Sequence, residues 1–99
     1  MMPIEELSLI IQNLRSQVAA RRYDEAIKFY YAQLDRPLYY SGENLRIIEL
    51  LEEFLDNAKT PFPSIDQGLQ ERICRSLIAV YQLTGQPYNA MALLKWLLD

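Results

Sequence analysis

The chain has 99 residues, a formal net charge of −3 and no histidine. This length suits one domain with a modest hydrophobic core, and the acidic balance argues against general nucleic-acid binding, which needs a basic surface. Without histidine the chain lacks the usual near-neutral general base and the usual zinc ligand.

Residues 3–36 predict a helical hairpin. In the first half of this segment, apolar residues recur at alternating spacings of three and four, the pattern of an amphipathic helix. A short basic break follows, and a second helix begins at about Tyr23. Pro37 disfavours helical geometry in the residue before it, so we expect this second helix to end at about Asp35 and to lead into a turn segment.

The middle of the chain predicts one helix over residues 43–58, with apolar positions so numerous that more than one neighbour must cover them. Two prolines then break the chain. Ser64 followed by Gln67 is a capping-box pattern, which predicts a second helical hairpin over residues 64–98.

Within this second hairpin, Gly85 is placed to end the first helix and Pro87 to open the second. No alternating run of β-branched residues indicates a strand. The sequence therefore predicts an all-α fold, with residues 1–99 forming a single domain of about five antiparallel helices.

The two predicted hairpins resemble each other. Each has a helix, a very short turn and a second helix with an alanine in its first turn, Ala26 in one and Ala90 in the other. A small residue lets two helices cross closely because no side chain holds the backbones apart, so we predict that both alanines are buried. Phe29 and Tyr31 lie outside the main apolar stripe of their helix, which is expected if that helix is covered on two faces.

At these residues the chain resembles the tetratricopeptide (TPR) repeat, whose pattern combines Leu, Gly or Ala, Tyr, a turn Gly, a second Tyr, Ala and an aromatic residue. The stretch from Leu77 to Leu94 resembles both helices of that repeat, and the stretch from Tyr23 to Leu34 resembles its second helix. The resemblance covers about half the chain. It implies a right-handed superhelix of helical hairpins or a small bundle.

The TPR resemblance also implies a protein-interaction module, in which the first helix of each hairpin lines an inner surface. Arg72, Arg75 and Gln82 would then lie on or near the surface that binds another protein or peptide. A complete TPR clamp for a C-terminal carboxylate is not expected, because Ser76 and Ala79 occupy the stretch where the asparagines would stand. We expect an adaptor, assembly factor or chaperone-like protein that buries the apolar face of a helical or extended segment.

The last predicted helix raises a second possibility. If no helix follows Asp99, Leu93, Trp96 and Leu97 would form an exposed apolar patch, which a soluble monomer rarely tolerates unless something binds it. Leu93 and Trp96 are therefore candidate partner-binding residues. The alternative function is a homodimerisation or subunit-joining domain that uses this face.

No catalytic, cofactor-binding or metal-binding residue is predicted. Glu49, Glu52, Glu53 and Asp56 share one side of a predicted helix, and a solvated surface is the simpler interpretation because no phosphate-binding glycine run accompanies them. Cys74 has no histidine to activate it as a nucleophile. A nucleic-acid-linked regulator has only a short basic turn in its favour, so no nucleic-acid partner is expected.

A single cysteine allows no internal disulfide and suits a reducing compartment. No apolar run approaches the roughly 20 residues that cross a bilayer, so we expect no direct membrane insertion. The N-terminal stretch carries acidic residues where a secretory signal would carry Lys or Arg. The expected location is cytoplasmic.

Overall fold

The computed structural model describes residues 4–99, and their regular structure is helical throughout, which confirms the predicted all-α class. Six α-helices and one short 3-10 helix follow one another within residues 4–99, where about five helices were expected. The chain divides into two compact units, Met1–Glu43 and Asn44–Asp99. Across the described residues, none of the helices combines the length and the apolarity needed to cross a bilayer.

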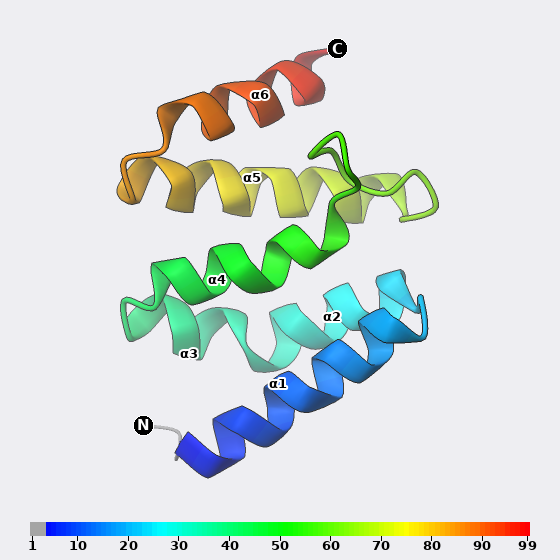
Figure 1. Cartoon of the computed structure of the whole chain (residues 1–99), viewed down its shortest axis with the longest axis vertical. Helices are drawn as coiled ribbons and strands as arrows, with labels where there is room; N and C mark the ends of the chain where they lie inside the picture. Colours follow the sequence, from blue (N-terminus) through cyan, green and yellow to red (C-terminus); the bar gives the residue numbers. More distant parts are fainter. Residues whose placement is uncertain (1–3) are drawn as a thin grey trace. The chain divides into compact units, whose positions relative to one another are not determined.

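The first unit begins with a hairpin of α1 (Ile4–Ala19) and α2 (Tyr23–Gln33), which pack against each other (Figure 1). Arg21 takes a positive φ of 60° in the tight turn between them. Ala26 is fully buried, as the sequence predicts. The other fully buried side chains of these two helices are Leu14, Ile27 and Tyr30.

The chain remains helical after α2. A separate short helix, α3 (Asp35–Tyr40), follows almost at once, so the prediction of a non-helical turn segment after Pro37 is wrong. Pro37 lies in the first turn of α3. Backbone N–H groups there have no acceptor within the helix, so a proline, which lacks the N–H, costs no helical hydrogen bond. Leu38 anchors α3, since its side chain is 1% exposed.

The second unit is built from α4 (Asn44–Leu51), α5 (Gln67–Leu83) and α6 (Pro87–Leu98). α5 packs against α4 on one side and against α6 on the other (Figure 1). Ala90 is 4% exposed, which confirms the prediction that it is buried. The core of this unit includes Ile47, Leu50, Leu51, Phe54, Ile73, Leu77, Val80 and Leu93.

α4 is shorter than predicted. It was expected to reach Ala58, but it ends at Leu51 and tightens into the 3-10 helix η1 (Glu52–Phe54). The carboxylate of Asp56 accepts the backbone N–H groups of Ala58 and Thr60 at 2.9 and 3.2 Å. A side chain that captures nearby backbone donors competes with the helix for them, and a compact loop forms instead.

α5 begins later than the capping-box prediction places it. Its N-cap is Asp66, whose carboxylate accepts the backbone N–H of Leu69 at 3.3 Å, so the assignment of Ser64 as the capping residue is wrong. The end of α5 agrees with the prediction, because Gly85 takes a positive φ of 73° just after the helix. Pro87 opens α6, also as predicted.

Candidate functional site

The solvent-facing side of α5 carries the three polar residues that were predicted to contact a partner. Arg72, Arg75 and Gln82 are all exposed. Their spacing places them on one side of a helix, and the buried Ile73 and Leu77 lie on the other side. The structure thus brings these three predicted residues together on one surface.

Leu93 does not belong to an exposed surface. Its side chain is only 2% exposed, so the prediction that it forms part of an exposed patch is wrong. The cause is the phase of the helix: Leu93 is three residues after Ala90, and residues at that spacing face the same way. Trp96 and Leu97 are half-buried. The burial of Ala90 could therefore have corrected the prediction for Leu93 from sequence alone.

Another set of apolar residues covers the exposed side of α6. Tyr88, Met91, Leu94 and Leu98 are 85%, 64%, 46% and 79% exposed. Their spacing of three, three and four residues forms a single stripe along the helix, on the side away from the buried Leu93. These four residues are named the α6 outer face.

One charged side chain lies along the α6 outer face. Lys95, the one charged residue of this 12-residue helix, is exposed and follows Met91 by four residues and Tyr88 by seven, so it shares their side of the helix. A helix of that length measures about 18 Å along its axis, so the stripe offers an apolar strip that extends over most of it. Contiguous exposed apolar surface on a soluble protein commonly marks a binding site.

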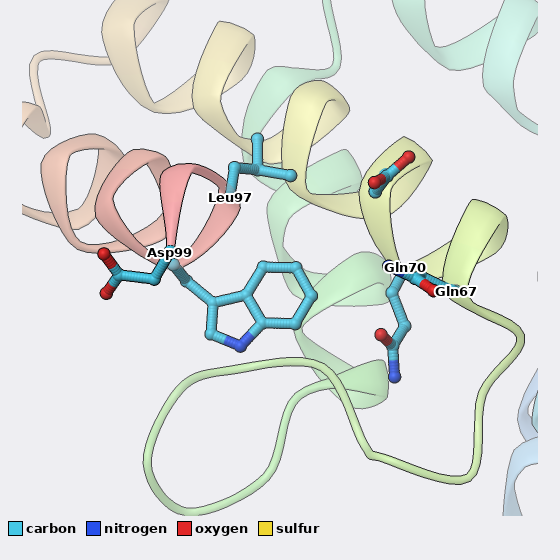
Figure 2. Close-up of a pocket in the computed structure, with 6 residues that line it drawn as sticks. Gln67, Gln70, Leu97 and Asp99 are labelled. Carbon is cyan, nitrogen blue, oxygen red and sulfur yellow. The ribbon is translucent and has the colours of Figure 1, made fainter.

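A cavity of about 400 Å³ lies between the start of α5 and the end of α6. Figure 2 shows Gln67 and Gln70 on the α5 side and Leu97 and Asp99 on the α6 side. The full lining consists of Gln67, Gln70, Glu71, Trp96, Leu97 and Asp99. Trp96, one of the predicted partner-binding residues, therefore belongs to this cavity and not to the α6 outer face.

The amide of Gln70 has a defined orientation in this cavity. Gln70 is 9% exposed, and its Nε2 donates to the backbone carbonyl of Phe62 at 2.8 Å. This hydrogen bond fixes the orientation of the amide, whose oxygen is the atom that can accept a hydrogen bond from a ligand. Two acidic residues, Glu71 and Asp99, complete the lining, and the carboxylate of Asp99 points away from Gln67 and Gln70 in Figure 2.

The acidic residues near the end of α4 have structural roles. The carboxylate of Glu52 accepts the hydroxyl of Tyr81 at 2.6 Å, and that of Asp56 accepts the loop donors described above. Within residues 4–99, no group of three or more His, Cys, Asp or Glu residues is placed to hold a metal ion.

Cys74 has the opposite environment to that of a reactive thiol. It is fully buried, and burial together with the nearby charge of Glu71 raises the pKa of its thiol to about 11. Nucleophilic cysteines have lowered pKa values and accessible sulfur atoms. Its position supports a packing role in the core.

A comparison of the chain with protein-family models, with curated proteins and with solved structures gave no significant match. The TPR resemblance is therefore an expectation that rests on the residues of this chain, and the two surfaces and the cavity have to be interpreted from their own chemistry.

Proposed function

We propose that this chain is a non-catalytic protein-interaction module, whose α6 outer face binds an amphipathic helix of another polypeptide. The observation that supports the proposal is the exposed apolar stripe formed by Tyr88, Met91, Leu94 and Leu98. A partner helix presents apolar side chains at the same helical spacings and removes both stripes from water. An adaptor, assembly factor or chaperone-like role in a reducing, cytoplasmic setting fits such a module.

The packing within the second unit favours a helix as the occupant. α5 is covered by α4 and by α6, and one further helix laid on the outer face would cover α6 in the same way. An extended peptide that adds to a sheet edge needs unpaired backbone groups, whereas the backbone of a helix is already hydrogen-bonded internally. A TPR-like stack of helical hairpins is the arrangement that we propose for the complex.

The exposed side of α5 is the second contact in this proposal. Arg72, Arg75 and Gln82 lie there, and in a TPR-like module this side would be the inner surface. Exposed charges of this kind affect the rate of association and the choice of partner more than they affect affinity. The apolar α6 outer face would supply most of the binding energy.

A matched pair of leucines tests the proposal. Leu98 on the α6 outer face is 79% exposed, and Leu45 on α4 is 70% exposed. The tagged wild-type chain and its Leu98→Glu and Leu45→Glu variants would be used to capture partners from cells. The same polypeptide should be retained by wild type and by Leu45→Glu, and lost by Leu98→Glu. Retention by Leu98→Glu, or loss by both variants, would exclude the α6 outer face as the binding site.

Self-association is the second candidate function, and the large exposed apolar residues of the α6 outer face favour it. Two copies could pack their α6 helices antiparallel about a twofold axis, so that each buries the same four residues. Light scattering at several concentrations would then show twice the 11.6 kDa mass of the chain. Leu98→Glu should return it to the monomer while Leu45→Glu should not. A monomer at every concentration would exclude this candidate.

A further inference from the structure

We propose that the cavity between the start of α5 and the end of α6 receives an arginine side chain of the protein partner. This inference rests on the proposed function, since the arginine belongs to a bound polypeptide. It concerns a different site from the α6 outer face, with a different chemistry. The residues that line the cavity supply an indole, two amides and the carboxylate of Glu71, and each of these is a group that a guanidinium can contact.

The charge of the lining selects a cation. Glu71 and Asp99 are both acidic, and none of the residues that line the cavity in the described part of the chain is basic. A phosphate or a carboxylate would meet charge of its own sign there. The chain as a whole also carries a net charge of −3, which attracts a basic partner over a longer range.

Trp96 favours arginine over other cations. It is half-buried and lines the cavity, so part of its indole is accessible to a ligand. A cation on the face of a tryptophan is attracted by the ring, and tryptophan is the strongest of the aromatic residues in this respect. A guanidinium is planar and weakly hydrated, so it stacks on the ring and loses less hydration than an ammonium group does.

Gln70 adds a fixed acceptor. Its Nε2 is held by the Phe62 carbonyl at 2.8 Å, which leaves the amide oxygen to accept from a guanidinium N–H. Gln67, on the preceding turn of α5, is exposed and can add a second amide oxygen. Several acceptors around one cavity suit the five N–H donors of arginine better than the single ammonium group of lysine.

The size and the place of the cavity also fit one side chain of a larger partner. A volume of about 400 Å³ is near the lower end of the range for ligand pockets, so it suits a single long side chain. The cavity lies at the end of α6, where the outer face ends with Leu98. A partner on the outer face would reach the cavity around the C-terminal end of α6, because Trp96 lies on the other side of that helix.

The single tryptophan of the chain provides a direct measurement, because all indole fluorescence comes from Trp96. The probes are two capped peptides of identical sequence, one containing arginine and the other citrulline, which has nearly the same shape without the charge. The arginine peptide should produce a saturable change in the fluorescence of Trp96 at millimolar peptide concentrations. The citrulline peptide should bind about tenfold more weakly. Equal binding of the two peptides, or no change with the arginine peptide, would overturn the inference.

Variants separate this site from the α6 outer face. Glu71→Gln should weaken the binding of the arginine peptide about fivefold. Glu49→Gln, the same change at an exposed residue of α4, should leave that binding unaltered. Leu98→Ser should also leave peptide binding unaltered, because Leu98 does not line the cavity and this change adds no charge beside it. The two proposals are therefore tested separately, because the peptide titration concerns only the cavity and the capture experiment concerns only the α6 outer face. A Glu71→Gln protein that keeps its circular dichroism spectrum and its full affinity would contradict the assignment.

Discussion

The hydroxyl of Tyr81 on α5 donates a hydrogen bond to the carboxylate of Glu52 at 2.6 Å, across 29 residues of sequence. Glu52 opens η1, directly after α4, so this bond joins the end of the α4 segment to α5. Tyr81 is 3% exposed, and its burial and the bond to Glu52 raise the pKa of its hydroxyl. The hydroxyl therefore remains a proton donor at any physiological pH.

Removal of this hydroxyl should destabilise the chain. We expect Tyr81→Phe to lower the free energy of unfolding by about 1–2 kcal/mol, because the Glu52 carboxylate loses its donor in a partly buried place. Urea unfolding followed by circular dichroism measures the change. Tyr88→Phe removes the same hydroxyl from a residue that is 85% exposed, and it should have almost no effect. Equal effects of the two variants would contradict the structural role of the bond.

Two alanines of α6 test the close approach of that helix to α5. Ala90 is 4% exposed, whereas Ala92 is exposed to solvent. Ala90→Leu should lower the free energy of unfolding by about 1–3 kcal/mol, since a larger side chain has to push the two helices apart. Ala92→Leu should change the stability by less than about 0.5 kcal/mol. A tolerated Ala90→Leu would show that the helices do not approach closely at this residue.

The N-cap of α5 is Asp66 in the structure, whereas the sequence pattern predicted Ser64, and two substitutions distinguish these assignments. Asp66→Ala should cost about 1 kcal/mol of unfolding free energy, because the backbone N–H of Leu69 loses its acceptor. Ser64→Ala should cost less than about 0.5 kcal/mol, since Ser64 is exposed and is not the N-cap. Thermal or urea unfolding measures both, and the reverse order would support the capping box that the sequence suggested.

Buried groups with raised pKa values predict lower stability in alkali. The pKa of Cys74 rises to about 11 from a usual value of 9.0, so the unfolded chain loses this proton at a lower pH than the folded chain. The contribution of Cys74 is thus fully present below pH 9.0 and is lost as the pH rises toward about 11, with a slope of up to about 1.4 kcal/mol per pH unit.

Urea unfolding at a series of pH values measures this loss. The pKa values of the Tyr30 and Tyr81 hydroxyls are also raised, chiefly by burial, so stability should continue to fall above pH 10.0. Cys74→Ala should reduce the slope between pH 9.0 and about 11, because it removes the thiol and leaves the two tyrosines. Unchanged stability over this interval in the wild-type chain would show that the thiol is not shielded from water.

The sequence was informative where one residue type decides the local structure. Ala26 and Ala90 were correctly expected to be buried, because a small residue early in a helix after a tight turn allows the two helices to pack closely. Gly85 and Pro87 were correctly placed at a helix end and a helix start, since a positive φ and a missing N–H are local properties. Local backbone chemistry is visible in a sequence.

The sequence was misleading where two local signals compete. Ser64 and Asp66 are both good capping residues, and only the path of the chain before α5 decides between them. Pro37 was expected to end helical structure, but a proline suits the first turn of a new helix equally well. Asp56 ended the α4 segment early by capturing backbone donors, a competition that composition alone does not reveal.

The candidate surfaces were predicted in part. Arg72, Arg75 and Gln82 do share an exposed side of α5, because helical periodicity fixes their relation. The cavity around Trp96 could not be found in the same way, since its residues come from two helices that meet only after folding and from no shared motif. The α6 outer face could have been found, because the phase set by Ala90 directs Met91 and Leu98 away from the core.

The affinity of the captured polypeptide for two variants tests the central claim most directly. Isothermal titration would give its Kd for the wild-type chain, for Leu98→Glu on the α6 outer face and for Leu45→Glu on α4. The account predicts that Leu98→Glu raises the Kd about tenfold or more, since a charge is forced into an apolar contact, while Leu45→Glu leaves it within about twofold. Equal Kd values for wild type and Leu98→Glu would contradict the claim that the α6 outer face binds the partner.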